Sequence, residues 1–226
     1  DRLRSRGLGD VYKRQSDGDM GANTGGMGAY APAPVMTKEL DKIVYDTILM
    51  PAVKAMKKEG CPFKGCLYAG LMITKDGPKV VEFNCRFGDP ETEAVLPLLE
   101  SDLAKIMLAC TKGTLKKERV EWKNACAVDV VLASEGYPAT HSSGEEIVGL
   151  EEAKKTGCLV FHAGSMKKNG RYFVNGGRVL NVAAVAPTLK EAQDKAYEGV
   201  SKISWRGMQY RHDIADKGLK RLKKRK

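Results

Sequence analysis

The types and spacing of Glu82, Asn84 and Arg86 could bind a metal ion and a phosphate. Val81 and Phe83 are apolar and would face a core if this segment is a strand. Glu82 and Asn84 would then share the opposite face, about 7 Å apart along the strand. Two such hard oxygen ligands suit Mg²⁺, which completes its shell with water and substrate phosphate. If the extended backbone continues, Arg86 joins this face and could hold a phosphate or a carboxylate. This arrangement favours phosphoryl transfer, and a solvent-facing strand edge with a Glu–Arg ion pair is the structural alternative.

A glycine-rich segment is the second candidate for chemistry. Residues 17–34 read DGDMGANTGGMGAYAPAP, which predicts one long structured loop without a regular element. Loops of this length are often functional. The backbone N–H groups of Gly25–Gly28 could bind an anion, or the glycines could form only a tight turn. Asp17 and Asp19 could order the loop through hydrogen bonds or contact an amine of a ligand.

Other familiar catalytic and metal-binding patterns do not occur in the sequence. There is no G-x-S-x-G motif and no Walker A motif, which argues against a serine nucleophile and a P-loop. The three histidines are far apart, so we expect structural roles for them. The six cysteines form no C-x-x-C pair, which disfavours a zinc site and predicts reduced, mostly buried thiols. The N-G-G-R run at 175–178 is expected to be a hairpin turn, with a ligand contact as the alternative.

The first half of the chain predicts helices around one hairpin. Thr37 can cap a helix with apolar residues at helical spacing, and Pro51 marks a kink or a second helix start. Two apolar runs, 66–73 and 79–85, flank an Asp-Gly-Pro turn and predict a β-hairpin. A further helix is predicted over 101–113, with its serine as N-cap and its glycine as the end.

The second half has a β-rich pattern. Four short β-like runs lie at 125–133, 158–164, 171–175 and 178–186. Thr188 and Glu191 form a T-x-x-E capping box that predicts a helix after them. Because the composition changes after a highly charged stretch, we place a domain boundary between residues 118 and 119.

The net charge is concentrated at the two ends of the chain. The sequence has 38 Lys and Arg against 28 Asp and Glu, a formal charge of +10. The first fourteen residues hold five basic and two acidic residues, and residues 218–226 hold six basic ones, so the body is close to neutral. Residues 1–12 lack periodicity and could be a scar or a misread gene start. Residues 218–226 are expected to be a solvated helix end or a basic tail, which makes a nucleic-acid-binding protein the alternative from another class.

Composition and the lack of targeting signals narrow the class of protein. Apolar residues make up 42% and charged residues 29%, which is typical of globular proteins and argues against disorder. No apolar run is long enough to span a bilayer, and the Arg-rich start does not resemble a signal peptide. We therefore expect a cytoplasmic protein that does not enter a membrane.

Four motifs, in order along the chain, carry a family resemblance. They are DGDMGANTGGMGAYAPAP (17–34), EFNCRFGDPETE (82–93), FHAG (161–164) and NGGRVL (175–180). Together they resemble the phosphoribosylamine–glycine ligases (glycinamide ribonucleotide synthetases) of purine biosynthesis, which belong to the ATP-grasp ligases. The resemblance covers nearly all of residues 13–215.

The resemblance implies a fold and a reaction. The fold class is α+β, with the C-terminal half of an ATP-grasp domain over 13–118 and a small β-rich C-terminal domain over 119–217. The implied reaction uses ATP to join glycine to 5-phosphoribosylamine through a glycyl phosphate, giving glycinamide ribonucleotide, ADP and phosphate. The partners are therefore ATP, glycine and 5-phosphoribosylamine, with Mg²⁺ or Mn²⁺.

The resemblance also implies roles for individual residues. The metal ligands are Glu82 and Asn84, and the catalytic residue is Arg86, which would neutralise charge on the transferring phosphoryl group. The substrate-binding residues are Asp19, Gly25, Gly26, Gly28 and Asp89.

The chain also departs from the family pattern. Ala22 stands where the family usually has Pro, and Glu93 stands where Gln is usual. The family has roughly half of its length before the D-G-D segment, so we expect a missing N-terminal half. We therefore expect the isolated chain to bind ATP weakly and not to turn over. Another ATP-grasp carboxylate–amine ligase is the nearest alternative function.

Overall fold

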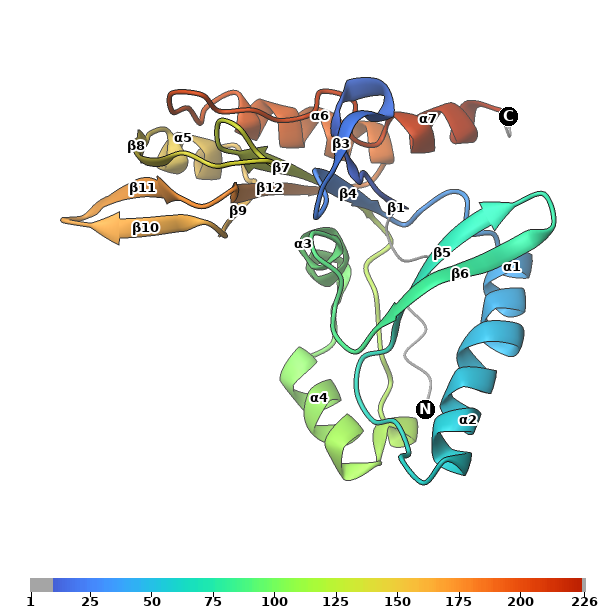
Figure 1. The fold of residues 1–226 in the computed structure, drawn as a ribbon. Coiled ribbons are helices and arrows are strands. Elements are labelled where there is room, and N and C mark those ends of the chain that lie inside the picture. Colours follow the sequence, from blue (N-terminus) through green and yellow to red (C-terminus); the bar gives the residue numbers. More distant parts are fainter. Residues whose placement is uncertain (1–9, 225–226) are drawn as a thin grey trace. The chain divides into compact units, whose positions relative to one another are not determined.

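The computed structural model describes residues 10–224, which form two compact units (Figure 1). The first unit contains residues 34–88 and 99–123, and the second contains residues 10–33, 89–98 and 124–224. Both units contain helices and strands, which confirms the expected α+β class.

Each unit is built from several separate stretches of the chain. A single boundary between residues 118 and 119 therefore does not describe these units, and the predicted domain boundary stays a prediction. The expected scar at residues 1–12 lies largely outside the described residues, and so does the end of the basic tail, residues 225–226.

A continuous helical segment opens the first unit. It consists of α1 (Lys38–Val44), the π-helical turn η2 (Tyr45–Leu49) and α2 (Met50–Lys58). Thr37 caps it as predicted, since its Oγ1 accepts a hydrogen bond from the Leu40 N–H at 3.1 Å. Pro51 lies in the first turn of α2, where a missing backbone N–H is tolerated. Of the kink or second helix start predicted at Pro51, the structure has α2 starting one residue before the proline, within a segment that stays helical.

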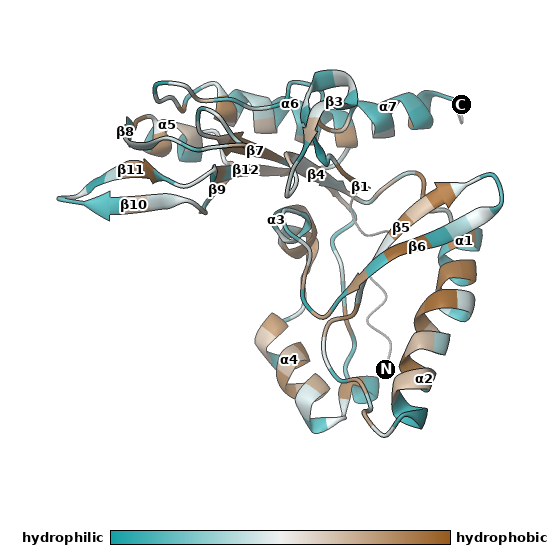
Figure 2. Cartoon of the chain, in the orientation of Figure 1, coloured by the Kyte–Doolittle hydropathy of each residue, from teal (hydrophilic) through white to brown (hydrophobic). Residues whose placement is uncertain are grey.

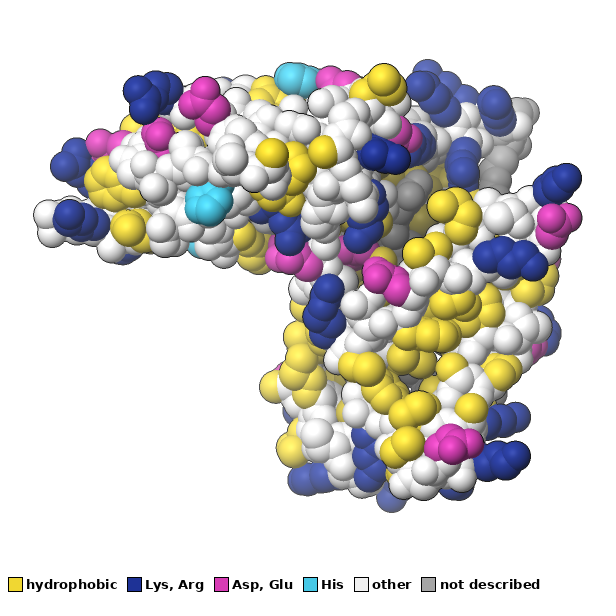
Figure 3. Space-filling model, in the orientation of Figure 1, with side chains coloured by type: hydrophobic (Ala, Val, Ile, Leu, Met, Phe, Trp, Pro, Cys, Tyr) yellow, Lys and Arg dark blue, Asp and Glu magenta, His cyan; other side chains and the backbone are white. Residues whose placement is uncertain are grey.

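The predicted hairpin is also present in the first unit. β5 (Tyr68–Thr74) and β6 (Gly77–Asn84) pair in antiparallel register, and a shift after Gly70 leaves Val81 without an opposite residue, as in a β-bulge. The expected burial of two apolar residues is wrong, because Val81 is 67% exposed and Phe83 is 44% exposed. A hairpin of only two strands leaves part of its apolar surface open, and Figure 3 shows hydrophobic side chains on the visible surface of this unit.

α4 (Leu103–Lys112) begins one residue later than predicted. Its N-cap is Asp102, whose side chain accepts a hydrogen bond from a backbone N–H of the first turn at 3.1 Å. The predicted cap, Ser101, is wrong, since its Oγ accepts instead from the Glu121 N–H at 2.8 Å. Gly113 ends the helix as expected, with a φ of 71°.

A small apolar core stabilises this part of the first unit. η4 (Leu115–Lys117) follows α4. The buried core residues are Ile106, Ala109 and Leu115. Leu99 packs against this core and forms an isolated β-bridge with Trp122.

A five-stranded antiparallel sheet forms the centre of the second unit. Its strands in spatial order are β1 (Asp10–Val11), β4 (Gly28–Ala31), β7 (Cys126–Ala133), β12 (Arg178–Ala186) and β9 (Leu159–His162). α3 (Glu91–Val95) and α6 (Leu189–Val200) contact β7 and β12 from opposite faces of the sheet (Figure 1). β7 is therefore buried on both faces, which explains its nearly continuous apolar sequence. The predicted β runs that became β7, β9 and β12 are confirmed.

The segment at 17–34 is not one irregular loop, so that expectation is wrong. It contains η1 (Asp17–Asp19), β3 (Met20–Asn23), which pairs with β2 (Arg14–Ser16), and the sheet strand β4. Glycine makes the last pairing possible. Gly28 has a φ of 155°, and a Cβ there would lie 2.6 Å from the Asp129 carbonyl oxygen.

A second, three-stranded sheet overturns the hairpin expected at N-G-G-R. Its strands in spatial order are β10 (Ser165–Lys168), β11 (Arg171–Asn175) and β8 (Ser143–Ile147). β11 and β12 belong to different sheets, so they cannot form a hairpin. Gly177, between the two strands, packs so closely on Tyr137 that a Cβ at this glycine would lie 2.4 Å from the ring. The Gly177 carbonyl oxygen accepts a hydrogen bond from the Ser134 N–H at 2.8 Å.

The remaining helices of the second unit are η3 (Leu96–Leu98), α5 (Leu150–Lys155) and α7 (Asp216–Lys223). The capping box that starts α6 is confirmed, because Thr188 and Glu191 each accept a hydrogen bond from the other's backbone N–H. α7 is mostly hydrophilic along its length (Figure 2), which agrees with the expected solvated helix end.

The cysteines are more exposed than predicted. All six are free thiols, but only Cys158 is buried, while Cys61 and Cys85 are exposed. The last two follow α2 and β6 in irregular segments, where an apolar neighbour in sequence does not imply a core position. No helix within residues 10–224 has both the length and the apolar character needed to cross a membrane.

Candidate functional site

Glu82 and Asn84 lie on the same face of β6 in the first unit. The pairing is regular over these residues, so alternation places both side chains on one side of the strand. Gly70 stands opposite Glu82, and a Cβ there would lie 3.1 Å from its Cγ, so the glycine leaves room for the glutamate. Glu82 is exposed and Asn84 is half-buried.

This pair of oxygen donors fits a divalent cation that keeps water or phosphate ligands. A carboxylate and an amide oxygen are the hard ligands that Mg²⁺ and Mn²⁺ accept. Residues 10–224 contain no group of three or more His, Cys, Asp or Glu side chains able to hold a metal. An ion bound to Glu82 and Asn84 would need further ligands besides these two.

Arg86 does not continue the strand as expected. β6 ends at Asn84 and the backbone bends over the next two residues, so the extended path does not reach Arg86. Its side chain is exposed, and Nη1 donates a hydrogen bond to the Phe87 carbonyl at 2.9 Å. The other guanidinium donors remain oriented by this contact and suit a phosphate oxygen.

The second unit brings three of the expected substrate-binding residues together around Arg178. Its Nη1 and Nη2 donate to the two carboxylate oxygens of Asp89 at 2.8 and 2.7 Å, a bidentate ion pair. Nη1 also donates to the carbonyl oxygens of Gly25 at 3.2 Å and Gly26 at 3.5 Å. The Arg178 side chain is only 22% exposed, and Asp89 is 55% exposed.

The glycine segment here is a packed turn and not an anion-binding nest. The N–H of Gly25 donates to the Tyr137 hydroxyl at 3.1 Å, and the N–H of Gly26 donates to Thr24 Oγ1 at 3.0 Å. Gly26 has a φ of 124°, and a Cβ there would lie 2.4 Å from Pro90 Cδ. Because these two N–H groups donate within the unit, the segment forms the tight turn that was the alternative to an anion-binding nest.

Asp17 and Asp19 order their segment by binding residues near the end of the chain. Arg211 is fully buried and donates to Asp19 at 3.1 Å, and Lys217 Nζ lies 2.5 Å from the same carboxylate. Asp17 accepts from the His212 N–H at 2.7 Å. Burial opposes ionisation of Asp19, but the hydrogen bonds from Lys217 and Arg211 outweigh it and lower its pKa. These contacts show that both aspartates order the segment, which is one of the two roles predicted for them.

A buried carboxyl group lies under α3. Asp129, on β7, is 0% exposed, and its Oδ2 accepts a hydrogen bond from Asn181 Nδ2 at 2.9 Å. Its Oδ1 is buried without a hydrogen-bond partner among residues 10–224, and the same is true of one oxygen of Glu93 on α3. Burial raises the pKa of Asp129 well above its ordinary range, and the nearby Glu93 raises it further. Burial also raises the pKa of Glu93.

Sequence reasoning therefore missed three residues that organise the second unit. The N-G-G-R motif contained Arg178, but its partners are distant in sequence. Asp129 interrupts an apolar run, which is a visible signal of a buried polar group. Arg211 carries no comparable local signal, because only the fold surrounds it with acidic residues.

The similarity of the chain to known proteins agrees with these features. A family model described as "Phosphoribosylglycinamide synthetase, ATP-grasp (A) domain" matches residues 5–92. A second, "Phosphoribosylglycinamide synthetase, C domain", matches residues 127–217. The chain belongs to the phosphoribosylglycinamide synthetase family. The resemblance seen in the motifs is confirmed.

Curated relatives within the phosphoribosylglycinamide synthetase family are similar over most of this chain. "Phosphoribosylamine--glycine ligase" of Caldanaerobacter subterraneus is 50% identical over 204 residues, which cover 90% of this chain and 48% of that protein. "Phosphoribosylamine--glycine ligase, chloroplastic" of Arabidopsis thaliana is 50% identical, covering 92% of this chain and 40% of that protein. The chain thus spans about half the length, or less, of the curated relatives it matches.

Solved structures show the same family fold. A crystal structure of phosphoribosylamine–glycine ligase from Thermotoga maritima is 40% identical, with a TM-score of 0.78 over 91% of this chain and 50% of that one. N5-carboxyaminoimidazole ribonucleotide synthetase from Thermotoga maritima is 18% identical with a TM-score of 0.55, a likeness of fold alone.

Proposed function

We propose that this chain forms part of an ATP-dependent ligase that joins glycine to 5-phosphoribosylamine. The carrying observation is the pair of oxygen ligands, Glu82 and Asn84, on one face of β6 in a chain that belongs to this family. The product is glycinamide ribonucleotide, with ADP and phosphate released. A cytoplasmic location is part of this proposal.

The chemistry requires activation of a poor electrophile. A glycine carboxylate oxygen attacks the γ-phosphorus of ATP, the bond to the β-phosphate oxygen breaks, and ADP leaves. The amine nitrogen of 5-phosphoribosylamine then attacks the carbonyl carbon of the glycyl phosphate. The C–O bond breaks, phosphate leaves, and the nitrogen loses a proton. In both steps negative charge develops on oxygens of the group that leaves, so catalysis depends on positioning and on charge stabilisation.

The residues divide into two groups by their chemistry. Glu82 and Asn84 would hold Mg²⁺ or Mn²⁺, which when bound neutralises phosphate charge. Arg86 would stabilise the transferring phosphoryl group with its free donors. The substrate-binding residues would be Asp19, Gly25, Gly26, Gly28 and Asp89.

A chimeric ligase tests the proposal. The matching segment of the Caldanaerobacter ligase is replaced by residues 13–217 of this chain, and ADP and glycinamide ribonucleotide are measured with ATP, glycine, 5-phosphoribosylamine and Mg²⁺. We expect product only when all substrates are present. Replacing glycine by other amino acids in the same assay tests for a ligase with another substrate, and a better rate with one of them would contradict the proposal.

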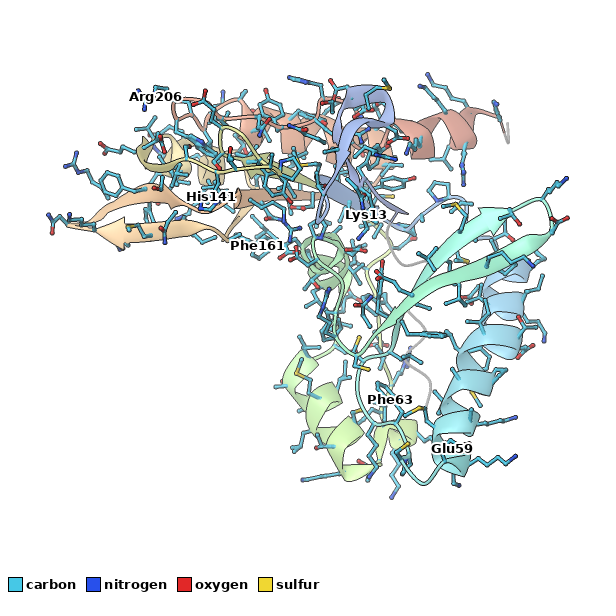
Figure 4. All side chains as sticks on the ribbon, in the orientation of Figure 1. Lys13, Glu59, Phe63, His141, Phe161 and Arg206 are labelled. Carbon is cyan, nitrogen blue, oxygen red and sulfur yellow. The ribbon has the colours of Figure 1, made fainter. Side chains whose placement is uncertain are left out.

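Matched variants of the chimera test the metal ligand. Glu82→Gln is expected to lower kcat by about 10²–10³-fold, the usual cost of losing one charge-stabilising group. Glu59→Gln is the control, since Glu59 is an exposed carboxylate after α2 in the same unit (Figure 4). Equal rates for the two variants, with both folded by circular dichroism, would exclude Glu82 as a ligand.

A further inference from the structure

Arg178 connects three segments of the second unit that are far apart in sequence. It begins β12, while Gly25 and Gly26 precede β4, and Asp89 precedes α3. We propose that Arg178 is a positioning residue that holds Gly25 and Gly26 against Asp89 and thereby shapes the substrate side of the site. This inference rests on the proposed ligase function, in which those three residues contact substrate.

The hydrogen bonds require the shape of an arginine. Both oxygens of Asp89 are bound, by Nη1 and Nη2, and Nη1 also reaches the Gly25 carbonyl. A planar guanidinium has several N–H donors in one plane, whereas all three donors of a lysine ammonium are on one nitrogen. A Cβ on Gly25 would lie 2.9 Å from Arg178 Cζ, so only glycine lets the guanidinium lie flat against the turn.

A second contact makes the arrangement rigid. Gly26 packs on Pro90, the residue after Asp89, so closely that a Cβ would overlap its ring at 2.4 Å. The turn and the Asp89–Pro90 segment are therefore held at two points, by packing and by the arginine. Because packed contacts of this kind do not stretch, loss of the arginine is expected to displace both segments together.

The charge of Arg178 balances the acidic groups around it. Burial is the main cause that raises the pKa values of Glu93 and Asp129, and Asp89 raises both further, while Arg178 opposes these effects. Removing the guanidinium would leave the carboxyl groups of Glu93 and Asp129 without the cation that opposes this rise in pKa.

Hydrogen exchange on this whole chain tests the positioning without any assay of activity. In Arg178→Gln, the Gly25 and Gly26 amides are expected to exchange about tenfold faster, since local opening becomes easier, while Val182 in β12 stays unchanged. Arg171→Gln is the matched control, because Arg171 makes a single, exposed ion pair with Glu146 in the same unit. Unchanged exchange at both glycines in Arg178→Gln would overturn the proposal.

Two further measurements keep the test decisive. If Arg178→Gln unfolds and all amides exchange fast, Arg178→Lys is measured instead. Faster exchange confined to the two glycines supports the proposal, and unchanged exchange at both overturns it.

In the chimeric ligase, Arg178→Gln is expected to raise KM for glycine or 5-phosphoribosylamine about tenfold and to change KM for ATP less than about twofold. An equal rise for ATP would overturn the positioning role. An inactive wild-type chimera would count against the ligase function alone, because the exchange result is independent of it.

Discussion

Burial of Asp129 predicts that the unfolding free energy of the protein depends on pH. The folded state binds its proton more tightly than the unfolded chain does, because the pKa of the buried carboxyl is raised from its ordinary value of 3.8. The unfolding free energy contributed by this group is therefore largest below pH 3.8 and falls as pH rises toward the folded pKa. Above that range the folded state contains a buried charge, one oxygen of which has no hydrogen-bond partner in the described part of the chain.

Asp129→Asn is expected to remove this pH dependence. The amide keeps an acceptor for Asn181 but cannot ionise, so at pH 8 the variant should be more stable than wild type by about 1–3 kcal/mol, because no charge has to be buried. Near pH 3 the two proteins should have similar stability. Urea unfolding at several pH values measures this, with the exposed turn variant Asp76→Asn as control. A variant less stable than wild type at pH 8 would contradict the expectation.

Arg211 has the opposite character, because it is a buried charge with full compensation. Its Nε and Nη2 donate to Asp213 at 2.7 Å, its Nη1 donates to Asp19, and its guanidinium lies 4.4 Å from the centre of the Tyr12 ring. Arg211→Met would leave acidic groups unpaired, so we expect a loss of about 3–5 kcal/mol in unfolding free energy. Chemical unfolding tests this. The exposed Arg171→Met should change stability by less than about 1 kcal/mol, and equal losses would refute the assignment.

At the scale of elements, the turn before β4 depends on glycine for two separate reasons. Gly26 has a left-handed φ of 124° and lies against Pro90, whereas Gly170, in the β10–β11 turn, has a φ of 79° with no atom within 4 Å of a Cβ. Both alanine variants should lose about 1–2 kcal/mol of unfolding free energy because of the backbone conformation. Gly26→Ala should lose more, because its Cβ must also displace the proline. Thermal unfolding of the two variants compares them, and equal losses would show that packing at Pro90 adds nothing.

Elements also explain which parts of the site local sequence could predict. Alternation along β6 correctly placed Glu82 and Asn84 on one face, because side-chain direction in a strand depends only on the backbone. Alternation wrongly predicted that Val81 is buried, since burial depends on what covers the strand. It also did not predict the bend before Arg86, where the ladder has already ended.

At the scale of the whole molecule, the larger share of the +10 charge lies at the C-terminal end of the sequence. α7 and the residues after it are rich in Lys and Arg, and its exposed cationic side chains belong to Lys220, Arg221, Lys223 and Lys224. A row of solvated cations binds phosphate backbones weakly and without sequence preference. Nucleic-acid binding would therefore be a property of this helix and not of the central sheet.

Changing those four residues to glutamine tests this assignment. We expect RNA binding by fluorescence anisotropy to weaken strongly and its salt dependence to flatten, while the same changes leave ligase activity of a chimera extended to residue 224 unaltered. RNA binding that persists in the variant would locate the nucleic-acid site elsewhere.

The sequence by itself determined the local structure and the family. Caps, turns and apolar spacing are read over a few residues, so the start at Thr37, the β5–β6 hairpin, the capping box of α6 and the strand β7 followed from them. The four motifs identified the family for the same reason, since each is a continuous run of residues.

Only the tertiary structure decided which distant residues meet. Gly25, Asp89 and Arg178 are separated by more than sixty residues from one to the next, and no local rule connects them. The same holds for Asp19 with Arg211, and for β11 and β12, which are neighbours in sequence but belong to different sheets. Pairing of this kind depends on strand order and on burial of both sheet faces, which are properties of the whole packed unit.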